Sequence, residues 1–108
     1  MKVLKTWLLY YVHDMDRAKA FYMKTFQVKP LKETEGWTEL DFGSLVLALH
    51  TLPAHGGGTM PHAGLIVQVD NLDGVQADIE RNGGRLVEKR DEGYRCYEDS
   101  EGNGFELC

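Results

Sequence analysis

The sequence has few of the residues that mark the specialised classes of protein. It contains two cysteines, Cys96 and Cys108, and neither stands in a CxxC or Cys/His zinc spacing. No apolar run approaches the roughly 20 residues that a membrane-spanning helix needs, and the N-terminus lacks the small-residue cleavage site of a signal peptide. We therefore expect a reduced, cytoplasmic protein that has no disulfide framework and no membrane partner.

Basic residues are also too scattered to form a nucleic-acid-binding surface. The 12 Lys and Arg are spread along the chain and outnumbered by 17 Asp and Glu, which gives a formal net charge of -5. Binding to nucleic acid normally requires a basic stripe, so we expect no such partner. The 108 residues suit one domain, large enough for a single core and one modest cavity.

The pattern of apolar residues repeats once along the chain. Strands are predicted at 3–12, 36–42 and 45–50, with a helix from Asp14 to about Thr25 and a loop at 29–35. After a glycine-rich stretch come a strand at 62–69, a helix capped by Asn71 or Asp73 and ending at Gly83, and short strands at 85–87, 94–97 and 104–107. Residues 12–16 and 69–73 share one pattern at an offset of 57 residues, which indicates an internal duplication. The fold class is therefore α+β in one domain, 1–108, with module 1 at about 1–52, a linker at 53–61 and module 2 at about 62–108.

Several motifs, taken in order, resemble a known superfamily. Val12-x-Asp14-Met15-x-Arg17-Ala18-x-x-Phe21-Tyr22 is similar to the opening signature of the vicinal oxygen chelate proteins, which include glyoxalase I, bleomycin-resistance proteins and extradiol dioxygenases. The segments 82–85 and 98–107 are similar to its second half. The resemblance implies two βαβββ modules that form an open half-barrel, with the ligand on the concave side.

The resemblance also implies four metal positions, one on the first and one on the last strand of each module. In this sequence they fall on Trp7, Ala48, Gly64 and Glu106. Only Glu106 has a side chain that coordinates a cation. We therefore expect the standard metal site to be lost and no cofactor to be required.

Strand periodicity predicts which residues line the groove instead. Side chains alternate between the two faces of a strand, so residues in phase with the four metal positions should face the ligand. We expect the ligand-binding residues to be Trp7, Leu9, Tyr11, Trp37, Ala48, His50, His62, Gly64 and Glu106. The large aromatic side chains among them either stack on a flat ligand or fill the space left by the metal.

Two classes of function fit this reading. The first is a small-molecule binding protein of the bleomycin-resistance type, which holds an aromatic or amphipathic ligand with Glu106 as its polar anchor. The second is an enzyme, a glyoxalase-like isomerase or lyase or a dioxygenase, with a relocated metal site at His50, His62 and Glu106. In a third arrangement Glu106 acts as a metal-free catalytic base, because desolvation in an apolar cavity without a cation raises a carboxyl pKa. The resemblance and the open sheet edges also predict a homodimer.

Overall fold

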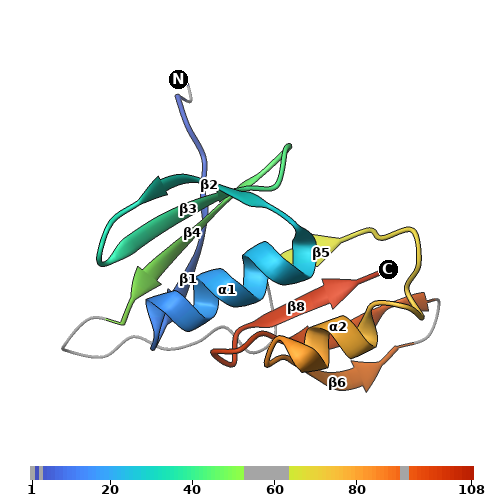
Figure 1. Ribbon diagram of the computed structural model, residues 1–108. Helices are drawn as coiled ribbons and strands as arrows, with labels where there is room; N and C mark the ends of the chain where they lie inside the picture. Colours follow the sequence, from blue (N-terminus) through green and yellow to red (C-terminus); the bar gives the residue numbers. More distant parts are fainter. Residues whose placement is uncertain (1, 3, 53–63, 91–92) are drawn as a thin grey trace.

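The computed structural model describes residues 2, 4–52, 64–90 and 93–108, which form two four-stranded sheets and two helices (Figure 1). Module 1 contains β1 (Leu8–Val12), α1 (Met15–Phe26), β2 (Lys29–Glu33), β3 (Trp37–Asp41) and β4 (Val46–Thr51). Module 2 contains β5 (Leu65–Val67), α2 (Gln76–Arg81), β6 (Arg85–Lys89), β7 (Arg95–Glu98) and β8 (Gly104–Leu107). The strand orders, β1-β4-β3-β2 and β5-β8-β7-β6, are equivalent. The predicted α+β fold with two βαβββ modules is confirmed, whereas the predicted linker lies outside the described residues.

The first helix forms where the sequence predicts it. The Asp14 carboxylate accepts a hydrogen bond from the backbone amide of Arg17 at 3.1 Å and so caps the first turn. The helix buries one stripe, Met15, Ala18, Phe21 and Tyr22, and ends at Gln27, which adopts a left-handed conformation. In Figure 1, α1 lies centrally between the two sheets, and it contacts β3, β4 and α2. No helix in the described part of the chain is long and apolar enough to cross a membrane.

The second helix is shorter than predicted and its predicted caps are wrong. It begins at Gln76 after Val75, and no side chain caps it. The Asn71 side chain instead accepts the Gly74 amide at 3.1 Å in a turn before the helix, and Asp73 pairs with Arg95 of β7. These polar residues therefore stabilise the connection to the helix rather than its first turn.

The predicted loop at 29–35 is also wrong, because most of it forms β2. Pro30, which cannot continue a helix, lies instead in β2, the outer strand of its sheet, where a missing backbone donor is tolerated. Its pairing with β3 shifts between Pro30 and Lys32, so Leu31 forms a bulge. The pairing of β6 with β7 shifts in the same way, which places Val87 in an equivalent bulge. The strands β1 and β5 begin later than predicted, at Leu8 and Leu65.

Buried aromatic residues join the two modules. The Tyr10 hydroxyl of β1 donates to the Gly104 carbonyl at 2.7 Å and accepts the Leu65 amide at 2.7 Å. Burial, as the main cause, raises the pKa of Tyr10 to about 12, so this hydroxyl is neutral at physiological pH. Phe21 of α1 packs edge-on against Phe105 of β8, with ring centroids 5.8 Å apart. The two sheets therefore share one core.

The turn between β7 and β8 fastens module 2 to the start of α1. Glu101 Oε1 accepts the backbone amides of His13 and Asp14 at 2.6 and 2.7 Å, and its other oxygen pairs with Arg17. Asp99 accepts a 2.6 Å hydrogen bond from the hydroxyl of Tyr22, and burial raises the pKa of this aspartate. These acidic residues of the resemblance motif are therefore structural, because their carboxylates face the core and the helix rather than a ligand.

Candidate functional site

Each sheet has one face that packs against the core and one that turns away from it. Tyr10, Val12, Leu47 and Leu49 of module 1 are fully buried in the core, as strand alternation predicts. We call the opposite surfaces the open faces. The register aligns Leu9, Ala48 and Glu39, then Tyr11, His50 and Trp37, on the open face of module 1. It aligns Ile66, Glu106 and Cys96 on the open face of module 2.

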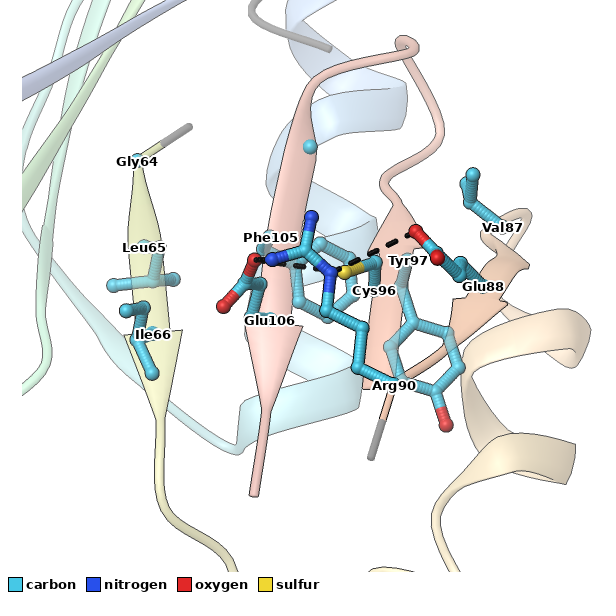
Figure 2. A pocket seen from close by; sticks show the side chains of 11 residues that line it. Gly64, Leu65, Ile66, Val87, Glu88, Arg90, Cys96, Tyr97, Phe105 and Glu106 are labelled. Atoms are coloured by element: carbon cyan, nitrogen blue, oxygen red, sulfur yellow. Dashed lines mark hydrogen bonds and ion pairs between the residues drawn. The ribbon is translucent and has the colours of Figure 1, made fainter. Parts of the chain in front are cut away.

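The open face of module 2 contains a pocket of about 310 Å³ (Figure 2). This volume is at the lower end of the range for small-molecule sites. The pocket is lined by Gly64, Leu65, Ile66, Val87, Glu88, Arg90, Cys96, Tyr97, Gly104, Phe105 and Glu106. Aliphatic side chains from β5 and β6 thus flank a polar centre, an arrangement that suits a ligand with an apolar body and one polar group.

Three side chains form the polar centre of this pocket. Arg90 Nη1 lies 3.4 Å from Glu106 Oε1, and the Cys96 thiol donates to the same oxygen at 3.5 Å (Figure 2). Arg90 Nε also lies 3.6 Å from a carboxylate oxygen of Glu88. The base mechanism was predicted for a Glu106 in an apolar cavity without a cation. In the structure, the Arg90 guanidinium lies beside Glu106, so that condition is not met. Burial raises the pKa of the Cys96 thiol, and the hydrogen bond to Glu106 raises it further, so Cys96 acts as a neutral hydrogen-bond donor to Glu106.

The open face of module 1 centres on a carboxylate, Glu39, that the sequence analysis did not select. Trp37 Nε1 donates to its Oε2 at 2.8 Å, and Lys5 Nζ lies 2.8 Å from its Oε1. The ammonium group of Lys5, as the first cause, and the Trp37 indole lower the pKa of Glu39. The His50 ring lies edge-on to Trp37 and to Tyr11, with centroids 5.6 and 5.8 Å away. His50 Nδ1 lies 2.6 Å from the Thr51 carbonyl oxygen, which fixes the orientation of the ring.

The predicted ligand-binding residues therefore fall into two groups on two sheets. Gly64 and Glu106 line the module 2 pocket, whereas Trp7, Leu9, Tyr11, Trp37, Ala48 and His50 belong to module 1. His62 lies outside the described residues. Within the described ranges, no three His, Cys, Asp or Glu side chains come together as metal ligands. His50 lies on β4 of the first sheet and Glu106 on β8 of the second.

The residues at the four family metal positions do not fit a metal. Tryptophan, alanine and glycine offer no side-chain ligand, which leaves Glu106 as a single donor. Gly64 is further restricted, because a Cβ at this position would lie 2.1 Å from the Tyr10 hydroxyl oxygen, and its φ is +121°. The Tyr10 hydroxyl, held by its two hydrogen bonds, thus occupies the space that the Cβ of a metal-ligating residue at position 64 would need.

Sequence reasoning missed Lys5, Glu39, Arg90 and Cys96. Strand alternation was sufficient to find Glu39, because Leu40 faces the core and its neighbour must face the opposite side. Cys96 aligns with Glu106 in the register of β7 and β8, which a hairpin alignment would also have indicated. No comparable signal existed for Lys5 and Arg90, since both lie outside the strands and reach the sites with long, flexible side chains.

Solved structures with the same fold cover nearly the whole chain. A fosfomycin resistance protein, FosX, from Listeria monocytogenes in complex with Mn(II) and sulfate superposes with a TM-score of 0.78 at 15% identity, covering 99% of this chain and 90% of that chain. FosX from Mesorhizobium loti gives a TM-score of 0.75 at 14% identity, with 99% and 92% coverage. An integron cassette protein from the mobile metagenome of V. cholerae gives 0.67 at 24% identity, with 99% and 95% coverage. At these identities the likeness shows the fold alone.

A search of the curated proteins finds no match to the chain. The sequence profile of the Glyoxalase/Bleomycin resistance protein/Dioxygenase superfamily, in contrast, matches residues 6–107. That range includes both modules and both open faces. The duplicated βαβββ fold and this match agree, and the protein belongs to the glyoxalase/bleomycin resistance protein/dioxygenase superfamily.

Proposed function

We propose that this protein binds a small organic ligand with an aromatic or amphipathic body, and that it does so without the standard metal of its superfamily. The observation that carries the proposal is the composition of the family metal positions, three of which have no ligating side chain, together with the pocket that two of these positions, Gly64 and Glu106, line. The pocket offers aliphatic walls and the Glu106–Arg90 pair as a polar anchor. Such a lining recognises one polar group and accommodates an apolar remainder.

The Glu106–Arg90 pair also limits the polar group that binds well. Glu106 is 23% exposed and Arg90 is 52% exposed, so both retain surface for a ligand. A group that both donates and accepts hydrogen bonds, such as an amide or a phenol, can satisfy the carboxylate and the guanidinium together. A purely apolar ligand would instead desolvate both charges without replacing their partners, which is unfavourable.

Metal titration combined with a ligand screen tests this function. Tag-free wild-type protein and Glu106→Gln are titrated with Ni²⁺, Zn²⁺, Mn²⁺ and Fe²⁺ by calorimetry, and small phenols and aromatic amides are screened by saturation-transfer NMR. We expect no stoichiometric metal binding, and ligands whose affinity falls about 10- to 100-fold in Glu106→Gln, as for loss of a charged hydrogen-bond partner.

The matched control is Glu98→Gln, which also removes an arginine-paired carboxylate from module 2 but lies outside the pocket lining. This variant should bind ligands as the wild type does. Stoichiometric metal binding that Glu106→Gln abolishes would contradict the proposal.

A second candidate function is metal-free acid–base catalysis, which the Glu106–Arg90 pair favours. A carboxylate can remove a proton next to a carbonyl group, and a guanidinium 3.4 Å away can stabilise the oxyanion that develops. The test is deuterium exchange of small ketones and aldehydes in D₂O, followed by NMR. Exchange that depends on both Glu106 and Arg90 supports this candidate, and exchange equal to the buffer rate excludes it.

The protein is also expected to form a homodimer. Large apolar side chains remain exposed along the open faces and edge strands, including Trp7 at 43%, Ile66 at 59% and Leu31 at 56%. A second copy that covers these surfaces would remove them from water and enclose each groove. Light scattering coupled to size exclusion should give the mass of two chains, and a monomer at high protein concentration would contradict the prediction.

A further inference from the structure

The Glu39 carboxylate lies on the open face of module 1 and is nevertheless shielded from water. The residue is 5% exposed, although the neighbouring strand residue Asp41 is exposed. Its Oε2 accepts from the Trp37 indole and its Oε1 accepts from the Lys5 ammonium group, each at 2.8 Å. The register places Glu39 directly opposite Ala48, one of the four family metal positions. A negative charge is therefore present next to that position, but on the neighbouring strand.

The cation that meets this carboxylate is an organic ammonium group from the same chain. Lys5 Nζ lies 4.8 Å from the centroid of the Trp7 ring, in cation–π geometry, while it contacts Glu39. Lys5 belongs to a segment before β1 that has no regular secondary structure, and the side chain is 47% exposed. The ammonium group thus reaches the site from a segment without regular secondary structure and from a half-exposed side chain.

The chemistry around Glu39 suits an ammonium group better than a metal ion. An indole N–H only donates hydrogen bonds, so Trp37 orients the carboxylate but cannot ligate a cation. The face of an indole attracts a diffuse positive charge, which describes an alkylammonium group and not a small divalent ion that requires several oxygen or nitrogen donors. The lowered pKa of Glu39 keeps the carboxylate ionised at neutral pH, as a cation site requires.

We propose that the open face of module 1 is a binding site for an organic ammonium group, held between the Glu39 carboxylate and the face of Trp7, and that Lys5 occupies it in the free protein. Trp37 is a positioning residue that holds the carboxylate. The inference rests on the proposed function in one respect, because it assigns a positive charge to the small-molecule ligand. The residues that carry it belong to module 1, so they can be tested separately from the module 2 pocket.

The test removes the internal ammonium group and supplies a free one. n-Butylammonium reproduces the lysine side chain, and n-butanol is its neutral counterpart; both are added at constant ionic strength to the wild type, Lys5→Ala and Lys5→Ala/Glu39→Gln. The sequence contains two tryptophans, so the indole N–H region of a ¹H–¹⁵N spectrum should hold two signals, which Trp7→Phe assigns. Lys2→Ala, which removes another exposed lysine of the same segment, is the matched control.

We expect n-butylammonium to shift the indole signals of Lys5→Ala saturably and n-butanol to leave them unchanged. An internal competitor that fills the site nine-tenths of the time weakens the apparent affinity of a free ligand about tenfold. Lys5→Ala should therefore bind n-butylammonium about ten times more tightly than the wild type or Lys2→Ala. The added Glu39→Gln change should weaken binding about tenfold or more, because it removes the charge while its amide oxygen can still accept from Trp37.

Two results would overturn the inference. In the first, n-butanol and n-butylammonium shift the indole signals of Lys5→Ala equally. In the second, Lys5→Ala/Glu39→Gln binds n-butylammonium as tightly as Lys5→Ala does. Trp7→Leu in the Lys5→Ala background, read through the Trp37 signal, gives an independent check at a partly exposed position. It should also weaken n-butylammonium binding. If phenols bind the Glu106 pocket but n-butylammonium does not bind Lys5→Ala, the ammonium site is refuted and the proposed function stands. If n-butylammonium binds to Lys5→Ala but no ligand depends on Glu106, the ammonium site stands and the proposed function of the Glu106 pocket is refuted.

Discussion

Replacing Glu101 by alanine should destabilise the protein more than any change to its ion-pair partner. The Glu101 side chain is fully buried, whereas that of Arg17 is 53% exposed. One carboxylate oxygen accepts both the His13 and the Asp14 amides, at the point where the chain passes from β1 into α1. Removing the carboxylate leaves two backbone donors without this acceptor, and it takes a negative charge away from the start of a helix.

The magnitude follows from these bonds. A hydrogen bond to a charged group contributes about 1.5–3 kcal/mol, so two give about 3–6 kcal/mol when both partners are buried. His13 and Asp14 are exposed residues, and water can replace part of the lost interaction. We therefore expect Glu101→Ala to lower the free energy of unfolding by about 2–4 kcal/mol. For a domain of this size, that corresponds to a fall in Tm of about 10–20 °C.

Urea unfolding followed by circular dichroism, on Glu101→Ala, Glu101→Gln and Arg17→Ala, measures this. Glutamine keeps an oxygen for both amides but loses the charge, so its effect should be intermediate. Arg17→Ala should have the smallest effect, because an exposed ion pair contributes little. An Arg17→Ala variant as unstable as Glu101→Ala would refute the reasoning, since the ion pair and not the amide contacts would then dominate.

Three further predictions concern the core and the glycines. Tyr10→Phe should lower stability by about 1–3 kcal/mol at pH 8, because two buried backbone partners lose the hydroxyl. Since the folded-state pKa of about 12 exceeds the unfolded value near 10, this stabilisation is complete below pH 10 and is lost as pH approaches 12. The difference between the urea midpoints of wild type and Tyr10→Phe, measured at pH 8, 10 and 11.5, should therefore shrink as the pH rises. The control Tyr94→Phe, at an exposed position, should show no such trend. Gly84→Ala should lower the free energy of unfolding by about 1–3 kcal/mol, measured by thermal unfolding, because its Cβ would lie 2.7–2.8 Å from atoms of α1, α2 and β7. The control Gly43→Ala meets no atom within 4 Å, so it measures backbone strain alone. Gly64→His should be destabilised and should not gain zinc or nickel affinity by calorimetry, because its Cβ would collide with the Tyr10 hydroxyl; stoichiometric metal binding in a stable variant would show that explanation to be wrong.

Patterns that act along one element allowed much of the fold to be predicted. The apolar stripe from Met15 to Tyr22 and the cap at Asp14 located α1, because one-sided burial and N-capping both depend on the spacing of residues close together in the sequence. Strand alternation separated the core residues from the open faces. The strand β2 escaped prediction because the tolerance for Pro30 depends on its position at the sheet edge, which is a property of the whole sheet.

The site was less predictable, because its charges meet across the fold. Glu106 could be selected from the sequence, but its neighbour Arg90 comes from the connection after β6 and reaches the pocket only in three dimensions. Lys5 and Glu39 are 34 residues apart, and no spacing rule pairs them. The resemblance placed Trp7 at one of the metal positions, but only the structure shows the Lys5 ammonium group beside its ring.

The matching bulges have a consequence for the history of the chain. Leu31 is the third residue of β2 and Val87 the third of β6, and each interrupts the pairing with the next strand at the same step. Two separate insertions at one equivalent position would be a coincidence, whereas a single insertion in an ancestral half-length gene would be copied when that gene duplicated. The matching bulges therefore favour an origin before the two modules were joined. A half-length unit with four strands and one helix would leave exposed the core that the two modules now share.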